Sequence, residues 1–446
     1  MKIPVKPVAV ERLLETVLTS NNFQNIILGG IGPAPAGKYR HWDILRHLQP
    51  PADFTPEEFW LAVKLARQPL YQRLPLNDSA GSPFKFLVFD LTLKLLHEID
   101  RNASGAIKGS DQVTDPHTRD TYLLKSLMEE AITSSQLEGA STTRDVAKDM
   151  IQRGRKPRDR SEQMISNNYA AMQFIRKLRD EPLSPALVLE LQRILTENAI
   201  DEPGAAGRFR RTDEDILVSD EIGTVLHRPP PARELARRME LMCRFANDTS
   251  DSPFVHPVIR SILLHFWLAY DHPFVDGNGR TARALFYWSM ARQGYWLCEF
   301  ISISRIIKKA PSSYARAFLY SETDDNDVTY FVLHQLRVIT RAIGELHEYL
   351  ARKADELRET QLFVRQSASV RNLLNHRQLA LINHGLKNPG FTYTIESHRN
   401  SHGVRYDTAR TDLLQLADHQ LLERGKTGRK FWFMAPKDLR ARLRKL

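Results

Sequence analysis

The 446-residue chain is poor in cysteine, with only Cys243 and Cys298. Two cysteines cannot form a disulfide framework or a cysteine-rich zinc site, so we expect a reducing compartment. Long apolar runs are also missing, and none approaches the roughly 20 residues of a membrane-spanning helix. Acidic residues and a helical pattern follow the first methionine too closely for a signal peptide. These absences predict a cytoplasmic protein with no membrane partner.

Most of the chain also lacks an excess of charge of either sign. The net charge is +10, yet the first 360 residues hold 47 Lys and Arg against 47 Asp and Glu. Residues 361–446 hold the other 16 basic and 6 acidic residues, so the whole excess lies there. A basic segment suits an acidic partner such as nucleic acid, and a solvated basic tail is the equal alternative.

The chain is longer than one hydrophobic core usually serves, which favours several domains. Residues 1–115 look helical with proline-rich breaks, and Thr55, Pro56 and Glu58 form a capping box at one helix start. Apolar periodicity predicts further helices over 121–142, 161–180, 185–199, 232–247, 256–270 and 280–294. Residues 216–227 alternate as a β-hairpin that turns near Glu221–Gly223. We expect a mainly α fold divided into residues 1–115, 116–345 and 346–446.

An amphipathic connector over residues 339–363 leads to the basic end of the chain. Helices are predicted over 375–386, near Ile395 and over 405–420, followed by strands over 419–425 and 430–436. Three helices and a two-stranded basic wing predict a winged helix-turn-helix. Its candidate DNA contacts are Arg405, Thr408 and Arg410 in the recognition helix, and Arg429 and Lys430 in the wing.

Residues 32–39, GPAPAGKY, imitate the spacing of a phosphate-binding P-loop. Pro33 and Pro35 lack the backbone N–H groups with which such a loop holds phosphate. Tyr39 replaces the Ser or Thr that would bind magnesium. We therefore predict a linker here.

The stretch HPFVDGNGRTAR, residues 272–283, gathers unusual chemistry in one loop before a helix. Gly277-Asn278-Gly279 allows backbone angles that point successive N–H groups into one concavity, which is an anion site. Arg280 and Arg283 are three residues apart, so their guanidinium groups lie on one helix face and suit phosphate. A structural turn and a nucleic-acid contact are the alternatives.

Two further residues of this loop suggest catalysis. Asp276 is out of place in an anion site unless a divalent cation such as magnesium lies between its carboxylate and phosphates. His272, with a pKa near neutrality, can take a proton from an attacking hydroxyl. Alone, each residue is more often structural, and only their conjunction favours phosphoryl or nucleotidyl transfer.

At every defining position this stretch resembles the H-x-F-x-D/E-G-N-G-R-x-x-R motif of Fic-domain proteins, and the resemblance extends from about residue 120 to about residue 345. It implies a helical enzyme that transfers AMP from ATP, with Mg²⁺, to a Ser, Thr or Tyr hydroxyl of a target protein. By this resemblance His272 is the base and Asp276 holds Mg²⁺. Gly277, Asn278 and Gly279 cradle the phosphates, and Arg280 and Arg283 bind the outer ones. Gly279 favours AMP transfer, since the Doc-like kinases of the family carry lysine there.

Residues 134–139, SSQLEG, resemble the S/T-x-x-x-E-G/N motif of autoinhibited Fic proteins. The resemblance implies that Glu138 pairs with Arg283 and occupies the fork meant for the γ-phosphate of ATP. In some relatives the same glutamate assists removal of AMP. A chance helix end is the alternative for so short a pattern.

The hairpin over 216–227 resembles the Fic flap, which can hold a target segment as an added strand. A purely structural hairpin is an equal alternative. A different class of function is a DNA-binding regulator whose Fic domain is a sensor or inactive, supported by the basic end of the chain. The sequence is compatible with a homodimer and decides neither the oligomeric state nor the target.

Overall fold

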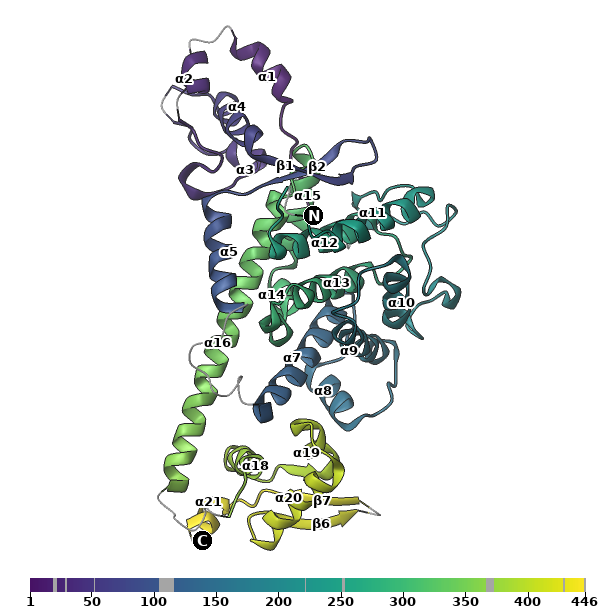
Figure 1. The fold of residues 1–446 in the computed structure, drawn as a ribbon, viewed down its shortest axis with the longest axis vertical. Helices are drawn as coiled ribbons and strands as arrows, with labels where there is room; N and C mark the ends of the chain where they lie inside the picture. The colour runs from purple at the N-terminus through teal and green to yellow at the C-terminus, as the bar shows by residue number, and fades with distance from the viewer. Residues whose placement is uncertain are drawn as a thin grey trace.

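Figure 1 shows the computed structural model of the chain, which describes residues 1–18, 22–28, 30–51, 53–103, 116–220, 222–250, 253–365, 373–427 and 430–444. Helices dominate these residues, and the strands form three small sheets, β1-β2, β3-β4 and β5-β7-β6. The prediction of a mainly α fold is confirmed. Of the predicted positions, Glu221 and Arg429 lie outside the described residues.

The N-terminal unit packs a small core of its own, which includes Trp42 and Trp60. Its helices are α1 (Val10–Val17), α2 (Phe23–Leu28), α3 (Trp42–Leu45) and α4 (Pro56–Arg67), with short 3-10 turns η1 (Pro35–Gly37) and η2 (Gln68–Leu70). The capping box predicted for α4 is present, because the Glu58 N–H donates to Thr55 Oγ1 at 3.2 Å and the Thr55 N–H donates to Glu58 Oε2 at 2.9 Å. The P-loop look-alike contains only the turn η1, and its Pro33 carbonyl accepts a hydrogen bond from Arg67.

The helical prediction for residues 71–87 is wrong. Strands β1 (Tyr71–Asn77) and β2 (Pro83–Leu87) form an antiparallel hairpin there. Asp78 Oδ1 closes the turn by accepting from the N–H groups of Ala80 and Ser82 at 3.0 and 2.8 Å. Alternate side chains of both strands are buried, so the strand period was present in the sequence but masked by prolines. Helix α5 (Asp90–Ala103) follows.

The central unit surrounds helices α12 (Pro257–Asp271) and α13 (Asn278–Arg292), which pack against each other and are buried along nearly their whole length. Around them lie α7 (Pro116–Leu137), α8 (Arg144–Arg153), α9 (Arg160–Lys177), α10 (Pro185–Thr196), η3 (Pro203–Ala205), η4 (Ala232–Glu234), α11 (Leu235–Asn247), η5 (Trp296–Phe300), α14 (Ile303–Lys309), α15 (Pro311–Thr323) and α16 (Thr329–Arg365). The helices predicted over residues 121–294 are confirmed. The predicted hairpin is also present, as β3 (Val218–Ser219) paired with β4 (Val225–His227).

The C-terminal unit has a separate core that includes Leu413 and Phe433. Its elements are α18 (His376–Lys387), β5 (Thr392–Thr394), α19 (Ile395–His402), α20 (Tyr406–Asp418), β6 (Glu423–Thr427), β7 (Lys430–Met434) and α21 (Leu439–Arg444). The predicted helices and two strands are present, whereas β5, which pairs with β7, was not predicted.

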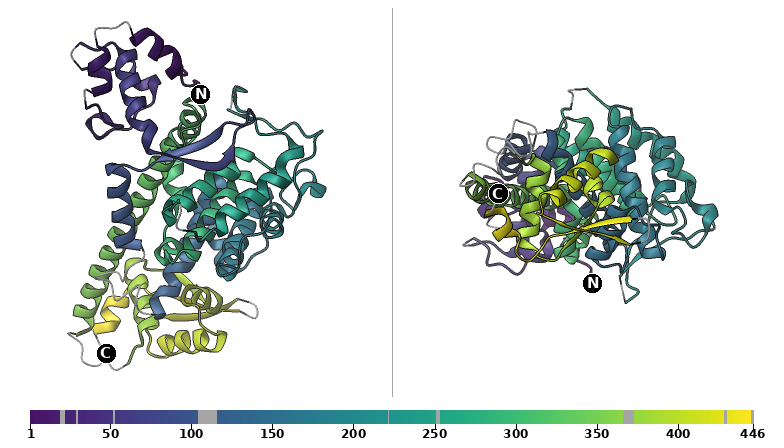
Figure 2. Two further views of the ribbon diagram at one scale, coloured as in Figure 1. Left: turned by 45° about the horizontal axis from the view of Figure 1, so that its top comes forward. Right: turned by 90° about the horizontal axis from the view of Figure 1, so that it is seen from below.

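The long helix α16 runs from the N-terminal unit past α5 toward the C-terminal unit (Figure 1). The N-terminal and C-terminal units lie at opposite ends of the molecule (Figure 2). Helix α19 packs against α7 and α8, where the Asn400 side chain donates to the Gln152 carbonyl. None of the described helices combines the length and apolar character that a bilayer crossing requires.

Candidate active site

His272 lies where α12 ends, in the left-handed backbone region with φ of 44°. Its N–H completes the helix by donating to the Leu268 carbonyl at 3.0 Å, and its Nδ1 lies 3.3 Å from the Ala269 carbonyl. A carbonyl oxygen only accepts, so Nδ1 carries the proton and Nε2 is left as the basic nitrogen. Burial lowers the pKa of His272 to about 4. The expected near-neutral pKa is thus wrong, and His272 is a neutral imidazole at pH 7.

Asn278 shapes the loop between α12 and α13. Its Oδ1 accepts from the Phe274 N–H at 3.0 Å, and its Nδ2 donates to the Phe274 carbonyl at 2.8 Å. Phe274 itself is fully buried and anchors the loop in the core. Because both ends of the Asn278 amide bind protein backbone, the only group of Asn278 that can face an anion is its N–H in the first turn of α13.

Gly277 and Gly279 are required for different reasons. Gly277 has φ of 84°, a conformation that side chains disfavour, and a Cβ there would lie 2.9 Å from Thr196 Cγ2. Gly279 has an ordinary backbone, but a Cβ there would lie 2.2 Å from Glu138 Oε1. The second glycine therefore makes room for the carboxylate that approaches from α7.

The two arginines of the loop are both buried and are held by different partners. Arg280 donates to the Leu195 carbonyl at 2.9 Å and to Asp276 Oδ1 at 3.0 Å. Arg283 donates through Nη2 to Glu138 Oε1 at 2.7 Å, and through Nε to Ser134 Oγ at 2.8 Å. The fork of Arg283 is thus filled by the two defining side chains of the SSQLEG segment.

Asp276 has the exposure and the free oxygen that a metal ligand needs. Its side chain is 32% exposed, and its Oδ1 accepts from Arg280 and from the Gly277 N–H at 2.5 Å. No described residue donates to its Oδ2. Within the described part of the chain no three His, Cys, Asp or Glu side chains come together as a metal site. A hard cation such as Mg²⁺ fits this single carboxylate if phosphate and water oxygens supply its other ligands.

Two residues that sequence reasoning missed hold the loop from outside. Gln192 of α10 is fully buried and donates to the Asp276 carbonyl at 3.0 Å. Arg210 donates through Nε to the His272 carbonyl and through its N–H to the Pro273 carbonyl, both at 2.9 Å. Gln192 carried a usable signal, because it is a polar residue within the apolar stripe of Val188, Leu191 and Leu195. Arg210 carried no such signal.

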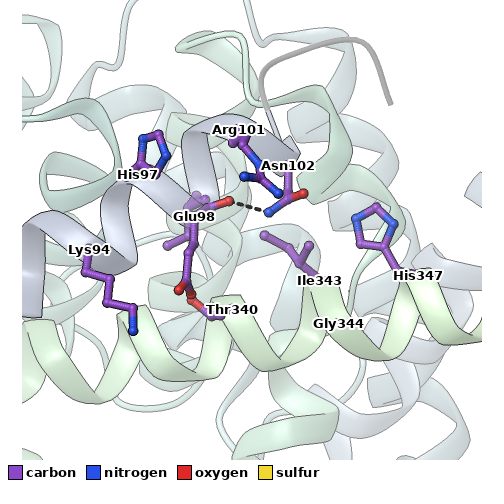
Figure 3. Close-up of a pocket in the computed structure, with 10 residues that line it drawn as sticks. Lys94, His97, Glu98, Arg101, Asn102, Thr340, Ile343, Gly344 and His347 are labelled. Carbon is purple, nitrogen blue, oxygen red and sulfur yellow. Dashed lines mark hydrogen bonds between the residues drawn. The ribbon is translucent and has the colours of Figure 1, made fainter. Parts of the chain in front are cut away.

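Other predicted positions lie elsewhere. Arg405 and Arg410 are exposed in the C-terminal unit and Thr408 is half-buried, while the side chain of Lys430 is not among those described. A cavity of about 480 Å³ lies between α5 and α16 (Figure 3). Its lining includes Lys94, His97 and His347 and no residue of the 272–283 loop, so it is separate from this site.

Comparison with known proteins identifies this loop. Residues 182–290 match the sequence model of the Fic/DOC family. The chain therefore contains a Fic domain over these residues. It is 36% identical over 111 residues to protein adenylyltransferase Fic of Nematostella vectensis, which covers 24% of this chain and 23% of that protein. It is 35% identical over 127 residues to the protein of the same name from Drosophila grimshawi, covering 28% of this chain and 24% of that one.

The match thus spans about a quarter of the length of these curated relatives. Among solved structures, a Fic family protein from Desulfovibrio desulfuricans is similar with a TM-score of 0.48 and 18% identity, over 78% of this chain and 97% of that one. The matched Fic region contains α10, α11, α12, most of α13, the β3-β4 hairpin and the whole loop, whereas Glu138 lies before it.

Proposed function

We propose that this protein transfers AMP from ATP to a hydroxyl side chain of a target protein. The observation that carries this proposal is the placement of a neutral, half-buried His272 next to the glycine loop at the N-terminus of α13. A base and an anion-binding helix end, here five to seven residues apart, are what transfer of a nucleotidyl group to a hydroxyl requires. The name protein adenylyltransferase of the relatives supports the same reaction.

In this mechanism His272 Nε2 takes the proton of the target hydroxyl. The hydroxyl oxygen then bonds to the α-phosphorus of ATP, the bond from that phosphorus to the bridging oxygen breaks, and pyrophosphate leaves. Asp276 would hold Mg²⁺, which neutralises phosphate charge when bound. The first-turn N–H groups of α13 bind phosphate oxygens, and the β3-β4 hairpin holds the target segment as an added strand.

Glu138 holds the enzyme in an inhibited state. Its carboxylate pairs with Arg283, whose side chain is 3% exposed and is also bound by Ser134. A charge-assisted pair of this kind competes with the γ-phosphate for the same fork. With the fork filled, ATP binds with its α-phosphate out of line for attack. We propose that Glu138 also assists the reverse reaction, removal of AMP from a modified target.

The test is the Glu138→Gly variant, assayed with labelled ATP for modification of itself or of proteins in a lysate. Removal of the carboxylate frees Arg283, so we expect AMP transfer at least tenfold above wild type. Adding Arg283→Ala should cancel the gain. Adding His272→Ala should abolish transfer while ATP binding, measured by calorimetry, persists. A Glu138→Gly variant that binds ATP but remains as inactive as wild type would remove Glu138 from this role.

A second function is favoured by the C-terminal unit, which we propose is a winged helix-turn-helix that contacts duplex DNA. The order α18, β5, α19, α20, β6, β7, with β7 between the other two strands, supports this assignment. Arg405 and Arg410 lie exposed at the start of α20, while α19 of the same unit packs on α7 and α8. A protein contact through the same face is the alternative outcome of its test.

A further inference from the structure

The flap is attached to the helix that presents His272 by one buried histidine. Strand β4 ends at His227, which is 9% exposed. Its Nδ1 lies 2.7 Å from Glu322 Oε2 of α15, and its Nε2 lies 2.7 Å from the Tyr270 carbonyl of α12. Tyr270 precedes His272 by two residues, so this contact joins the hairpin to the last turn of α12.

The hydrogen bonds of His227 determine how many protons it carries. A carboxylate and a carbonyl can only accept, while a neutral imidazole has a single N–H to donate. Two short contacts to two acceptors are both satisfied only if both ring nitrogens carry a proton.

We propose that His227 is an imidazolium at neutral pH and a positioning residue for the base His272. Its two hydrogen bonds fix the flap to α12 and to α15, and its positive charge disfavours a proton on His272. The inference rests on the proposed function in one respect, the role of His272 as the base.

The charged groups around His227 agree with this assignment. Burial opposes its charge, yet Glu322, the Tyr270 carbonyl and Asp271 together raise the pKa of His227 above its ordinary value. Asp271 is itself held by the guanidinium of Arg238 at 2.6 Å. For His272 the main cause of the lowered pKa is burial, and the charge of His227 acts in the same direction. Glu138 acts in the opposite direction, so its removal leaves the effect of His227 more visible.

Nitrogen NMR of the full-length protein labelled with ¹⁵N-histidine tests the charge without any activity assay. The His227 signals are those lost in the His227→Gln variant. We expect both ring nitrogens to be protonated at pH 7, and we expect Glu322→Gln, the milder change, to lower the pH at which His227 loses a proton. Signals of a neutral imidazole at pH 7 in the wild-type protein would overturn the proposal.

The effect of His227 on the base His272 is measured by the NMR titration of His272 and by the pH dependence of the rate of AMP transfer. In the Glu138→Gly background, His227→Gln should move the acid limb of AMP transfer, and the NMR titration of His272, to higher pH by a few tenths of a unit or more. The matched control is His256→Gln, which removes a histidine paired with Asp100 at 3.1 Å at the other end of α12. The control should leave the acid limb in place.

The NMR titrations and the AMP-transfer assay test this inference and the proposed function separately. An unchanged His272 titration in a folded His227→Gln variant would overturn the positioning role. If Glu138→Gly transfers no AMP at all, the proposed function fails, while the NMR titrations still decide whether His227 is charged and whether it acts on His272.

Discussion

At the scale of single residues, the loop depends on backbone geometry as much as on charged groups. Gly277 begins α13 in a left-handed conformation, with its carbonyl bound by Thr281 Oγ1 at 2.8 Å and its N–H by Asp276. The glycine therefore orients both the first turn of α13 and the metal-binding candidate Asp276. A change at this position affects folding and phosphate binding together.

We expect Gly277→Ala to lower the free energy of unfolding by about 1–2 kcal/mol, because alanine resists φ of 84° and its Cβ would lie 2.9 Å from Thr196 Cγ2. ATP binding should weaken in parallel. Urea unfolding measures the first effect and calorimetry the second. Gly204→Ala is the control, since it has open space around it and no left-handed backbone. Equal stability of the two variants would contradict the account of the loop.

The residue types of the site could be predicted from the sequence, but their partners could not. His272, Asp276 and both arginines lie within twelve residues, so local pattern was sufficient to find them. Gln192, Arg210 and His227 are 43 to 84 residues away from the atoms that they hold, and only the fold brings them there. The pKa of His272 was missed for the same reason, because burial by distant elements lowers it.

At the scale of elements, the N-terminal unit is joined to the central unit by a buried ion pair. Lys64 of α4 donates to Asp324 Oδ1 at 2.7 Å, just after α15, and the two side chains are 4% and 0% exposed. The Tyr330 hydroxyl of α16 donates to the other oxygen of Asp324 at 2.8 Å. Three elements that are distant in the sequence therefore meet at one carboxylate.

We expect Asp324→Asn to destabilise the protein by about 3 kcal/mol or more, because it leaves the Lys64 charge buried without its main partner. Glu190→Gln is the matched control, since its pair with Arg193 at 2.8 Å is 43–44% exposed and should contribute less than about 1 kcal/mol. Urea unfolding compares the two. A loss in Asp324→Asn no larger than the loss in the control would show that the pair does not stabilise this junction.

Helices were predictable and short strands were not. Apolar periodicity over ten or more residues identified α7, α9, α10, α12 and α13, and packing then kept them as helices. Strand β5 has three residues, too few for an alternating pattern, and exists because β7 pairs with it. The β1-β2 hairpin was missed because Pro75 and Pro83 are unusual in strands, although both tolerate an edge position.

At the scale of the whole molecule, buried histidines predict loss of stability in acid. Burial lowers the pKa of five of them, to about 4 for His41, His272 and His334, to about 3 for His402 and well below 6.5 for His265. These histidines bind protons more strongly in the unfolded chain than in the folded protein. Their contribution to the free energy of unfolding is therefore complete above about pH 6.5 and is lost as the pH decreases toward 4. His227, with its raised pKa, opposes this trend as a single residue.

We therefore expect the Tm to fall steadily from pH 7 to pH 5. His334→Gln should remove part of that fall, whereas His47→Gln, at an exposed position, should not. Differential scanning calorimetry across this range gives the measurement. A Tm that is constant or rises toward pH 5 would contradict the assignment of these histidines as neutral in the folded protein.

The uneven charge of the chain leads to the last prediction, which concerns DNA. The excess of +10 lies in residues 361–446, while the rest of the chain is balanced. Binding of a cationic face to duplex DNA releases counterions, so the logarithm of the affinity falls linearly with the logarithm of salt concentration, by about 0.9 per phosphate contact. Arg405 and Arg410 are exposed at the start of α20, where a recognition helix contacts DNA.

We expect the full-length protein to bind duplex DNA with a steep salt dependence. The double variant Arg405→Ala, Arg410→Ala should reduce the slope of log affinity against log salt concentration by about 2. The control removes the same charge from the Fic domain, with Arg233→Ala and Arg237→Ala near and on α11, and should leave the slope unchanged. Fluorescence anisotropy at several salt concentrations measures all three proteins. Equal slopes for the two double variants, or no binding by the wild-type protein, would assign this face of the C-terminal unit to a protein contact.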